Sequence, residues 1–279
     1  MLTQPFAARL VPARPDLAAD HLRGKVQSER FVRGRPCLVT ATLLDVTATP
    51  AADGERTTEL VYGESFTVYE ERDDGMAWGQ AALDGYVGYV PASGLGPAQG
   101  PGKRVTALWS QVYAGPSARA RVVAELPFLA EVRVKGSTGG FYRLRDGGFV
   151  PRAHLEPVED DFVGLAERFL GSPYLWGGRS RRGIDCSGLV QVARIAAGHP
   201  TPRDSDMQAA QVGTALCEEV PLRRGDLVFW KGHVGIMRDP ETLLHASGHH
   251  MAVVAEPLAA ACARIARAGG GPVVARRRP

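Results

Sequence analysis

Short hydrophobic segments separated by turn residues dominate the chain from about residue 35 onward. Asp-Gly and Gly-Glu pairs separate them, as turns do between antiparallel strands. Four such segments lie between Cys37 and Pro91, and each is rich in β-branched or aromatic residues or in alanine: CLVTATLLDV, ELVYGESFTVYEE, MAWGQAAL and GYVGYVP. This pattern predicts a small β-barrel over residues 35–97.

The same pattern returns over residues 103–157, after the glycine- and proline-rich linker GPAQGPGK. Four positions correspond at a constant offset of 60 residues, namely Tyr89, Val90, Pro91 and Leu95 with Phe149, Val150, Pro151 and Leu155. An internal duplication of a barrel of about 55 residues is therefore predicted. Both copies resemble bacterial SH3 domains.

The periodicity becomes helical after Glu156. Apolar residues recur at helical spacing over 162–170, behind a cap at Asp160 or Asp161, and Gly171 ends the predicted helix.

A second amphipathic helix begins at Cys186, with Asp185 as its N-cap. We expect a loop over the next segment, HPTPRDSDMQAAQVG, followed by the strands DLVFW, HVGIM and TLLHAS. Helices followed by an antiparallel sheet indicate an α+β domain over residues 158–279.

Composition narrows the functional class. The chain has 279 residues and a formal net charge of +3, and its basic residues are scattered except at Arg276–Arg278, so we expect no nucleic-acid partner. The four cysteines are widely spaced, which favours reduced thiols. No apolar run approaches a membrane span. The N-terminal capping segment, residues 1–34, has one expected short helix near 16–27 and lacks the apolar core of a signal peptide. We therefore expect a soluble, cytoplasmic protein without a membrane partner, and a disordered Arg276–Arg278 tail.

Cys186 stands where a chemical role is expected. It opens the predicted helix, so its thiol meets the positive end of the helix dipole. That position is expected to lower the thiol pKa from about 8.5 toward neutrality. Ser187 and Gly188 leave space beside the sulfur for a substrate and for an oxyanion site built from backbone N–H groups. These neighbours favour a nucleophile over a small core residue.

Two histidines complete the predicted nucleophilic site. A turn near Asp239 and Pro240 joins HVGIM to TLLHAS, which places His233 and His245 opposite or nearly opposite each other across a hairpin. In a triad, one imidazole accepts the thiol proton and the other orients it. We assign His233 as the base and His245 as the orienting residue.

The same residues also allow a zinc site. Cys186, His233, His245 and the adjacent His249 and His250 are of the ligand types that zinc prefers. The sequence has no local ligand pair such as CxxC or HExxH. We therefore expect no metal and no cofactor.

Five motifs occur in the order found in NlpC-type cysteine peptidases. They are SPYLWGG with Tyr174, DCSG around Cys186, GD before a strand, HVGI at His233 and HAS at His245. From about residue 161 to 257 the chain resembles these papain-like enzymes, which cut peptidoglycan stem peptides. With its paired barrels it is similar to the multidomain γ-D-glutamyl-L-diamino-acid endopeptidases. The implied fold class is α+β: a papain-like catalytic domain, with helices packed on an antiparallel sheet, preceded by two small SH3-like β-barrels.

The resemblance implies catalytic roles at the matching positions. The family's nucleophile falls on Cys186, its base on His233, its third polar residue on His245 and its active-site tyrosine on Tyr174.

It also implies a pocket for a free N-terminal L-alanine. In the second half of the chain the pocket residues are Asp204 and Ser205, with Asp185 and Ser187 beside the nucleophile. The first barrel is expected to add a carboxylate and a tyrosine, for which the candidates are Glu64 and Tyr86, with Glu59 and Tyr89 close behind.

The resemblance therefore implies a cysteine endopeptidase acting on murein stem peptides, L-Ala-γ-D-Glu-diamino acid, at the γ-D-Glu to diamino-acid bond, in murein peptide recycling. A carboxylate facing the substrate ammonium would exclude a peptide still attached to sugar. Two alternatives stay open: a wall-peptide binding module with an inactive catalytic domain, and a papain-like acyltransferase. The third stem residue, diaminopimelate or lysine, and the oligomeric state are open as well.

Overall fold

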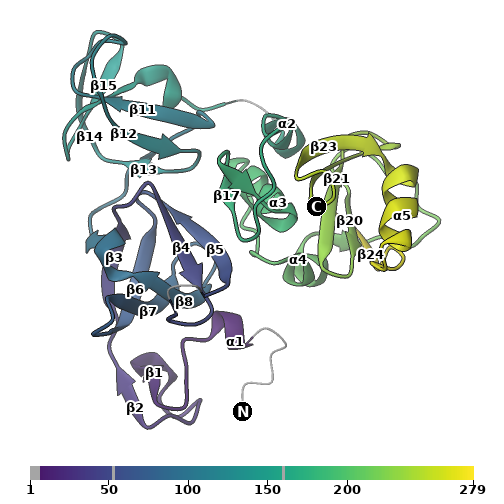
Figure 1. The fold of residues 1–279 in the computed structure, drawn as a ribbon, viewed down its shortest axis with the longest axis horizontal. Coiled ribbons are helices and arrows are strands. Elements are labelled where there is room, and N and C mark those ends of the chain that lie inside the picture. The colour runs from purple at the N-terminus through teal and green to yellow at the C-terminus, as the bar shows by residue number, and fades with distance from the viewer. Residues whose placement is uncertain (1–6, 52–53, 159–160) are drawn as a thin grey trace. The chain divides into compact units, whose positions relative to one another are not determined.

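The fold is described from a computed structural model, which covers residues 7–51, 54–158 and 161–279. The chain divides between Pro157 and Val158 into two compact units (Figure 1). This division falls where the predicted catalytic domain begins. Asp160, one of the two caps expected for the first helix of the second unit, lies outside the described residues.

Seven strands of the first unit form a sheet with the order β5-β4-β8-β7-β6-β3-β9. Their bounds are β3 Arg35–Val39, β4 Leu43–Thr47, β5 Arg56–Val61, β6 Ser65–Glu71, β7 Met76–Ala81, β8 Val87–Pro91 and β9 Leu95–Pro97. The segment ELVYGESFTVYEE is two strands, because a turn at Gly63 interrupts it. Gly63 has φ 84°, and a Cβ there would lie 2.1 Å from the carbonyl oxygen of Glu131, so the turn requires glycine.

A second sheet in the same unit has the order β12-β11-β16-β15-β14. Its strands are β11 Trp109–Tyr113, β12 Val122–Pro127, β14 Val134–Thr138, β15 Phe141–Leu144 and β16 Phe149–Pro151, and a separate ladder pairs β10 Lys103–Arg104 with β13 Glu131–Val132. This order repeats that of β5-β4-β8-β7-β6. Both sheets also carry a 3₁₀ turn directly after the corresponding strand, η2 Ala92–Gly94 and η3 Arg152–His154. The two sheets therefore share the order of five strands.

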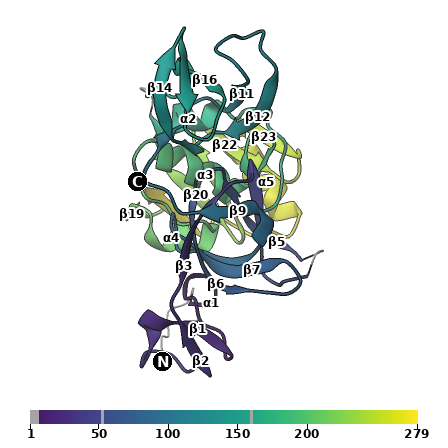
Figure 2. The ribbon, with the colours of Figure 1, turned by 90° about the vertical axis from the view of Figure 1, so that its left-hand side faces the viewer.

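The helix expected near residues 16–27 is wrong. This segment contains β1 (Leu17–Ala19) and the 3₁₀ turn η1 (Asp20–Leu22), and β1 pairs in parallel with β2 (Arg30–Val32). Three successive residues of β1 are fully buried, which a covered strand can achieve and a surface helix with one apolar stripe cannot. In Figures 1 and 2, β1 and β2 lie at the end of the first unit opposite the second sheet.

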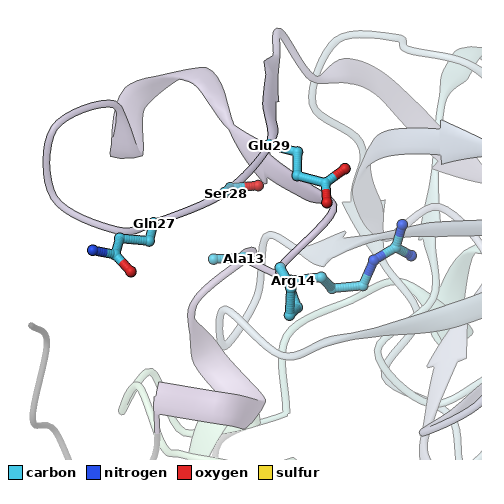
Figure 3. A pocket seen from close by; sticks show the side chains of 6 residues that line it. Ala13, Arg14, Gln27, Ser28 and Glu29 are labelled. Carbon is cyan, nitrogen blue, oxygen red and sulfur yellow. The ribbon is translucent and has the colours of Figure 1, made fainter.

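Arg14 attaches this N-terminal segment to the first sheet. Its guanidinium lies 4.5 Å from the ring centroid of Trp78 and donates a 2.8 Å hydrogen bond to the Tyr89 hydroxyl. It also pairs with Glu70 at 2.8 Å. Figure 3 shows this side chain extending toward the strands, while Gln27 lies on the other side of a pocket of about 630 Å³. The capping segment is therefore an integral part of the first unit.

The second unit places two helices on the two sides of one sheet (Figure 1). The sheet has the order β19-β24-β20-β21-β22-β23, and its pairs are antiparallel. Its strands are β19 Thr214–Ala215, β20 Leu227–Trp230, β21 His233–Met237, β22 Thr242–Ser247, β23 Ala252–Pro257 and β24 Ala275–Arg278. The helices are α3 (Cys186–Ala196) and α5 (Leu258–Arg267). The helix expected from a cap at Asp161 is α2 (Phe162–Glu167), where the Asp161 carboxylate accepts a hydrogen bond from the Gly164 N–H.

Two expectations for this unit are wrong. The expected loop after α3 contains a helix, α4 (Ser205–Gln211), which forms because Met207 and Gln208 are buried. The expected disordered tail is β24, which pairs with β20. Arg278 also forms an ion pair with the buried carboxylate of Asp226, so a charged segment becomes ordered through its partners. No helix among the described residues is long and apolar enough to cross a membrane.

Candidate active site

Cys186 is the first residue of α3, as the sequence predicts. The Asp185 carboxylate caps the helix by accepting a 2.7 Å hydrogen bond from the Gly188 N–H. A Cβ at Gly188 would lie 2.5 Å from the Gly178 carbonyl oxygen, so only glycine lets the preceding loop approach the helix this closely. The thiol is held at a defined place by this loop and cap.

The expected low pKa of Cys186 is wrong for this state. Burial raises the pKa of the thiol to about 12, and the negative charge of Asp185 adds to the effect. The backbone N–H groups of Val234 and Ser187, both directed at the sulfur, and the Arg203 cation oppose this rise but do not overcome it. A helix N-terminus by itself favours the thiolate, so the raised pKa of the thiol is an effect of burial. The resting thiol is therefore protonated and needs a base.

Arg203 ties together the residues around the nucleophile. It is 1% exposed, and its Nη2 lies 2.6 Å from Asp185 Oδ2. Its Nη1 donates to Asp185 Oδ1 at 3.0 Å and to Ser187 Oγ at 2.9 Å. Asp185 and Ser187 thus hold the start of α3, and their contact with substrate stays a prediction. Sequence reasoning missed Arg203, although it stands directly before the Asp204-Ser205 pair.

Asp204 and Ser205 begin α4. Gln208 of this helix donates a 2.9 Å hydrogen bond to the Ser187 carbonyl oxygen, which joins α4 to the start of α3. The structure therefore brings Asp204 and Ser205 to the same end of α3 as Cys186. Their role in amine binding stays a prediction.

Tyr174 lies in the loop before α3 and close to Cys186. Its backbone N–H donates to the Met251 carbonyl oxygen at 2.9 Å. Burial raises the pKa of its phenol, and negative charge on Cys186 and Asp185 raises it further, against the Arg203 cation. The hydroxyl therefore stays protonated and can donate a hydrogen bond to an oxyanion.

His233 and His245 meet as the hairpin prediction requires. His233 Nε2 lies 2.7 Å from His245 Nδ1, and the two ring planes are inclined at 67°, with centroids 5.0 Å apart. Burial lowers the pKa of His233 to about 3, and the positive charges of His245 and Arg264 lower it further. His233 begins β21, directly before Val234, whose N–H is directed at the Cys186 sulfur. The neutral His233 imidazole therefore belongs to the residue directly before Val234, whose N–H faces the Cys186 sulfur.

Glu256 is a functional candidate that sequence reasoning missed. Its Oε1 lies 2.8 Å from His245 Nε2, and Arg264 of α5 forms an ion pair with the same carboxylate. The sequence offered no signal for this contact, because it depends on the pairing of β22 with β23.

The segment that carries these residues is similar to known proteins. The model of the NlpC/P60 family matches residues 171–263, which include Cys186, His233, His245 and Glu256. The probable endopeptidase NlpC of Escherichia coli is 41% identical over 108 residues, which are 35% of this chain and 69% of that protein. The chain belongs to the NlpC/P60 family. Members of this family are cysteine peptidases.

The other matches of this NlpC/P60 protein extend over its first unit. The model described as a bacterial dipeptidyl-peptidase SH3 domain matches residues 46–95, within the first sheet. A γ-D-glutamyl-L-lysine dipeptidyl-peptidase of Bacillus cereus is 28% identical over 222 residues, and one of Bacillus subtilis is 32% identical over 140. The first match covers 70% of this chain and 63% of that relative. The second match covers 44% of this chain and 46% of that relative.

A solved structure shares the fold. The crystal structure of an NlpC/P60 family protein from Bacillus cereus matches with a TM-score of 0.71 at 20% identity, over 87% of this chain and 99% of that one. At this identity the likeness shows the fold alone. The family's papain-like arrangement of helices on a sheet is therefore present in this chain.

The SH3-domain candidates for substrate binding belong to the first unit of this NlpC/P60 protein. The Glu64 carboxylate accepts a 3.0 Å hydrogen bond from the Val61 N–H, within its own turn, and Tyr86 is 4% exposed. Glu59 is buried, and Tyr89 binds Arg14. A part for any of them in substrate binding stays a prediction.

No metal cluster is present within the described ranges. There, no group of three or more His, Cys, Asp or Glu side chains is arranged to hold a metal ion. His249 and His250, which a zinc site would have used, pack ring against ring, and His250 Nδ1 lies 3.0 Å from Ser247 Oγ.

Proposed function

We propose that this NlpC/P60 peptidase cleaves the γ-D-Glu to diamino-acid bond of peptidoglycan stem peptides that carry a free N-terminal L-Ala. The observation that carries the proposal is a buried Cys186 whose sulfur faces the N–H of Val234, directly after His233, which is itself hydrogen-bonded to His245. Two relatives named γ-D-glutamyl-L-lysine dipeptidyl-peptidase support the bond that is cut. The expected product is the dipeptide L-Ala-γ-D-Glu.

The reaction begins from a neutral thiol and a neutral imidazole. His233 accepts the thiol proton as the sulfur attacks the γ-carbonyl carbon, so charge is created only when substrate is in place. The oxyanion of the tetrahedral intermediate accepts hydrogen bonds from the Tyr174 hydroxyl and from backbone N–H groups at the start of α3. The His233 imidazolium then donates its proton to the leaving amine. Water, deprotonated by His233, hydrolyses the thioester and restores the thiol.

The free N-terminus of the substrate is the proposed specificity determinant. Asp204 and Ser205 at the start of α4 supply a carboxylate and a hydroxyl for the ammonium group, and Glu64 and Tyr86 of the first unit are the further candidates. A charge-assisted contact of this kind is lost when the amine is acylated. A stem peptide still joined to sugar through L-Ala is therefore rejected. We propose that an enzyme with this specificity recycles released peptides in the cytoplasm.

We also propose that the second sheet is a second SH3-like domain. Its support is the shared strand order and the constant offset of 60 residues between the two regions. The relatives named above support lysine as the third stem residue.

The deciding experiment compares four peptides with wild type and Cys186→Ala. They are L-Ala-γ-D-Glu-L-Lys, the same peptide with meso-diaminopimelate, and the N-acetylated form of each. Release of L-Ala-γ-D-Glu is followed by mass spectrometry. We expect cleavage of free peptides by wild type alone. Equal cleavage of acetylated peptides would remove the amine-binding pocket but keep the nucleophile. No cleavage of any peptide would favour a binding module or an acyltransferase.

A further inference from the structure

We propose that Glu256, held by Arg264, is a positioning residue that fixes which nitrogen carries the proton on both histidines. This inference rests on the proposed peptidase function, because it assigns the base of that reaction to one atom, His233 Nδ1.

The geometry is a continuous chain of contacts through His245. This imidazole is 1% exposed and uses both ring nitrogens: Nδ1 lies 2.7 Å from His233 Nε2, and Nε2 lies 2.8 Å from Glu256 Oε1. Arg264 pairs with the same carboxylate from α5. The side chains of Glu256 and Arg264 are 15% and 20% exposed, so the ion pair is largely shielded from water.

The Glu256 carboxylate determines which nitrogen is the donor in each of these hydrogen bonds. An ionised carboxylate can only accept, so His245 Nε2 must carry the hydrogen. His245 Nδ1 is then the bare acceptor, and His233 Nε2 must be the donor to it. His233 Nδ1 is consequently left without a proton. His233 Nδ1 is thus the nitrogen that can accept the Cys186 proton, and Glu256 selects it through His245.

Glu256 is ionised under ordinary conditions. Burial acts against the charge, but hydrogen bonds from His245 and Arg264 lower the pKa of the carboxyl below its usual value. Other titratable groups that act on Glu256 or on the two histidines are Arg264, His250 and Asp185. His250 Nδ1 lies 4.0 Å from Glu256 Oε1 and bonds to Ser247, so it is not the main partner of the carboxylate.

The fold builds this arrangement from two adjacent elements. β23 pairs with β22 over its whole length, which sets Glu256 opposite Leu243 and beside the strand that carries His245. The chain turns at Pro257 directly into α5, and Arg264 lies on that helix. β23 therefore positions the Glu256 carboxylate, and the helix that follows it, α5, positions the Arg264 counter-ion.

Control variants distinguish a positioning role for Glu256 from a purely structural ion pair. Glu167 serves as the matched control, because this carboxylate also pairs with arginines in the same unit, Arg238 and Arg224, and neither of these partners is a histidine. Glu256→Gln keeps an acceptor oxygen without the charge, whereas Glu256→Leu removes the acceptor at similar size.

The test combines two measurements that need no peptide substrate. Nitrogen-15 spectra of protein labelled at its 7 histidines report the tautomers of His233 and His245. The rate of Cys186 alkylation by iodoacetamide, resolved by peptide mass spectrometry, reports proton removal from the thiol. In wild type we expect both rings to be Nε2–H tautomers.

Glu256→Leu is expected to disturb both tautomers and to slow Cys186 alkylation by about 10- to 100-fold, by analogy with the loss of partners that orient metal-binding histidines. Glu256→Gln is expected to keep the tautomers and much of the rate, and Glu167→Gln to match wild type. Arg264→Met provides a second route if Glu256→Leu does not fold, and it is expected to slow alkylation too.

Unchanged tautomers and an unchanged rate in Glu256→Leu, or in Arg264→Met if the first variant does not fold, would overturn the inference. Equal losses in Glu256→Gln and Glu256→Leu with wild-type tautomers would also overturn it, because a positioning role requires the conservative variant to recover function. If wild type cuts none of the peptides while these results hold, the proposed substrate fails and the proton assignment stands.

Discussion

His233 and His245 share a 2.7 Å contact although they are diagonal across the hairpin. The register of β21 and β22 pairs Ile236 with Leu244, so the two histidines are displaced by two positions. Such diagonal neighbours are within reach of long and aromatic side chains. The His245 ring spans the displacement, and its other nitrogen lies 2.8 Å from Glu256 Oε1.

Removing the base should affect the chemical step much more than substrate binding. His233→Ala is expected to lower kcat by about 10²- to 10⁴-fold, the usual contribution of a general base, with a small change in KM. His245→Ala is expected to cause a smaller loss, since His233 remains. Steady-state kinetics on the preferred free peptide measures both, and His249→Ala, in an exposed turn, is the control that should retain activity. A larger effect on KM than on kcat for His233→Ala would contradict the assignment.

Cys186 should react as a protonated thiol in the free enzyme. Burial and Asp185 raise its pKa, so its alkylation by iodoacetamide is expected to be slow at neutral pH and to accelerate throughout about pH 6 to 9, because the thiolate fraction increases as pH rises. The lowered pKa of His233 keeps that imidazole neutral over this range. A rate that is already fast and constant near neutral pH would instead indicate a preformed thiolate.

Arg203 should be essential for the stability of the second unit. Arg203→Ala leaves the Asp185 carboxylate buried without its main cation, which is expected to cost about 3–5 kcal/mol of unfolding free energy. Arg224→Ala, which breaks the exposed pair with Asp161, is expected to cost about 0–1 kcal/mol. Denaturant unfolding of both variants measures the difference. Similar losses in the two would show that the buried pair has no special weight.

Arg14 should hold the N-terminal segment on the first sheet. Arg14→Ala removes the cation over Trp78 and the bonds to Tyr89 and Glu70, so we expect faster hydrogen exchange in residues 13–19. The cation–π contact alone contributes about 0.5–2 kcal/mol. Arg72→Ala breaks an exposed pair with Asp74 in the turn between β6 and β7, and it is expected to leave this exchange unchanged. Unaltered protection in Arg14→Ala would show that β1–β2 pairing suffices.

Local sequence signals predicted the parts of the site that depend on local structure. Asp185 as a cap and Cys186 as the first helical residue follow from spacing and side-chain type, and the hairpin followed from its turn residues. The pKa of Cys186 could not be predicted in this way, because it is set by burial, which depends on what the rest of the fold places over the thiol.

Long-range partners account for most of what the sequence did not reveal. The charged residues of β24 are typical of an exposed tail, and only the ion pair of Arg278 with the buried Asp226 orders them. Arg203 and Glu256 lie in segments that carry no distinctive pattern, and their roles come from contacts across helices and strands. A charged side chain can be predicted to be buried only when its long-range partner is known.

The position of β24 has a consequence for synthesis of the chain. This strand lies between β19 and β20, although β20 is complete more than forty residues earlier in the sequence. While a ribosome is still translating the intervening segment, one edge of β20 is an open row of hydrogen-bonding groups, and Asp226 lacks its counter-ion. Such an edge is a template for pairing with another chain. The nascent catalytic unit is therefore most vulnerable to aggregation, and most in need of a chaperone, during that interval.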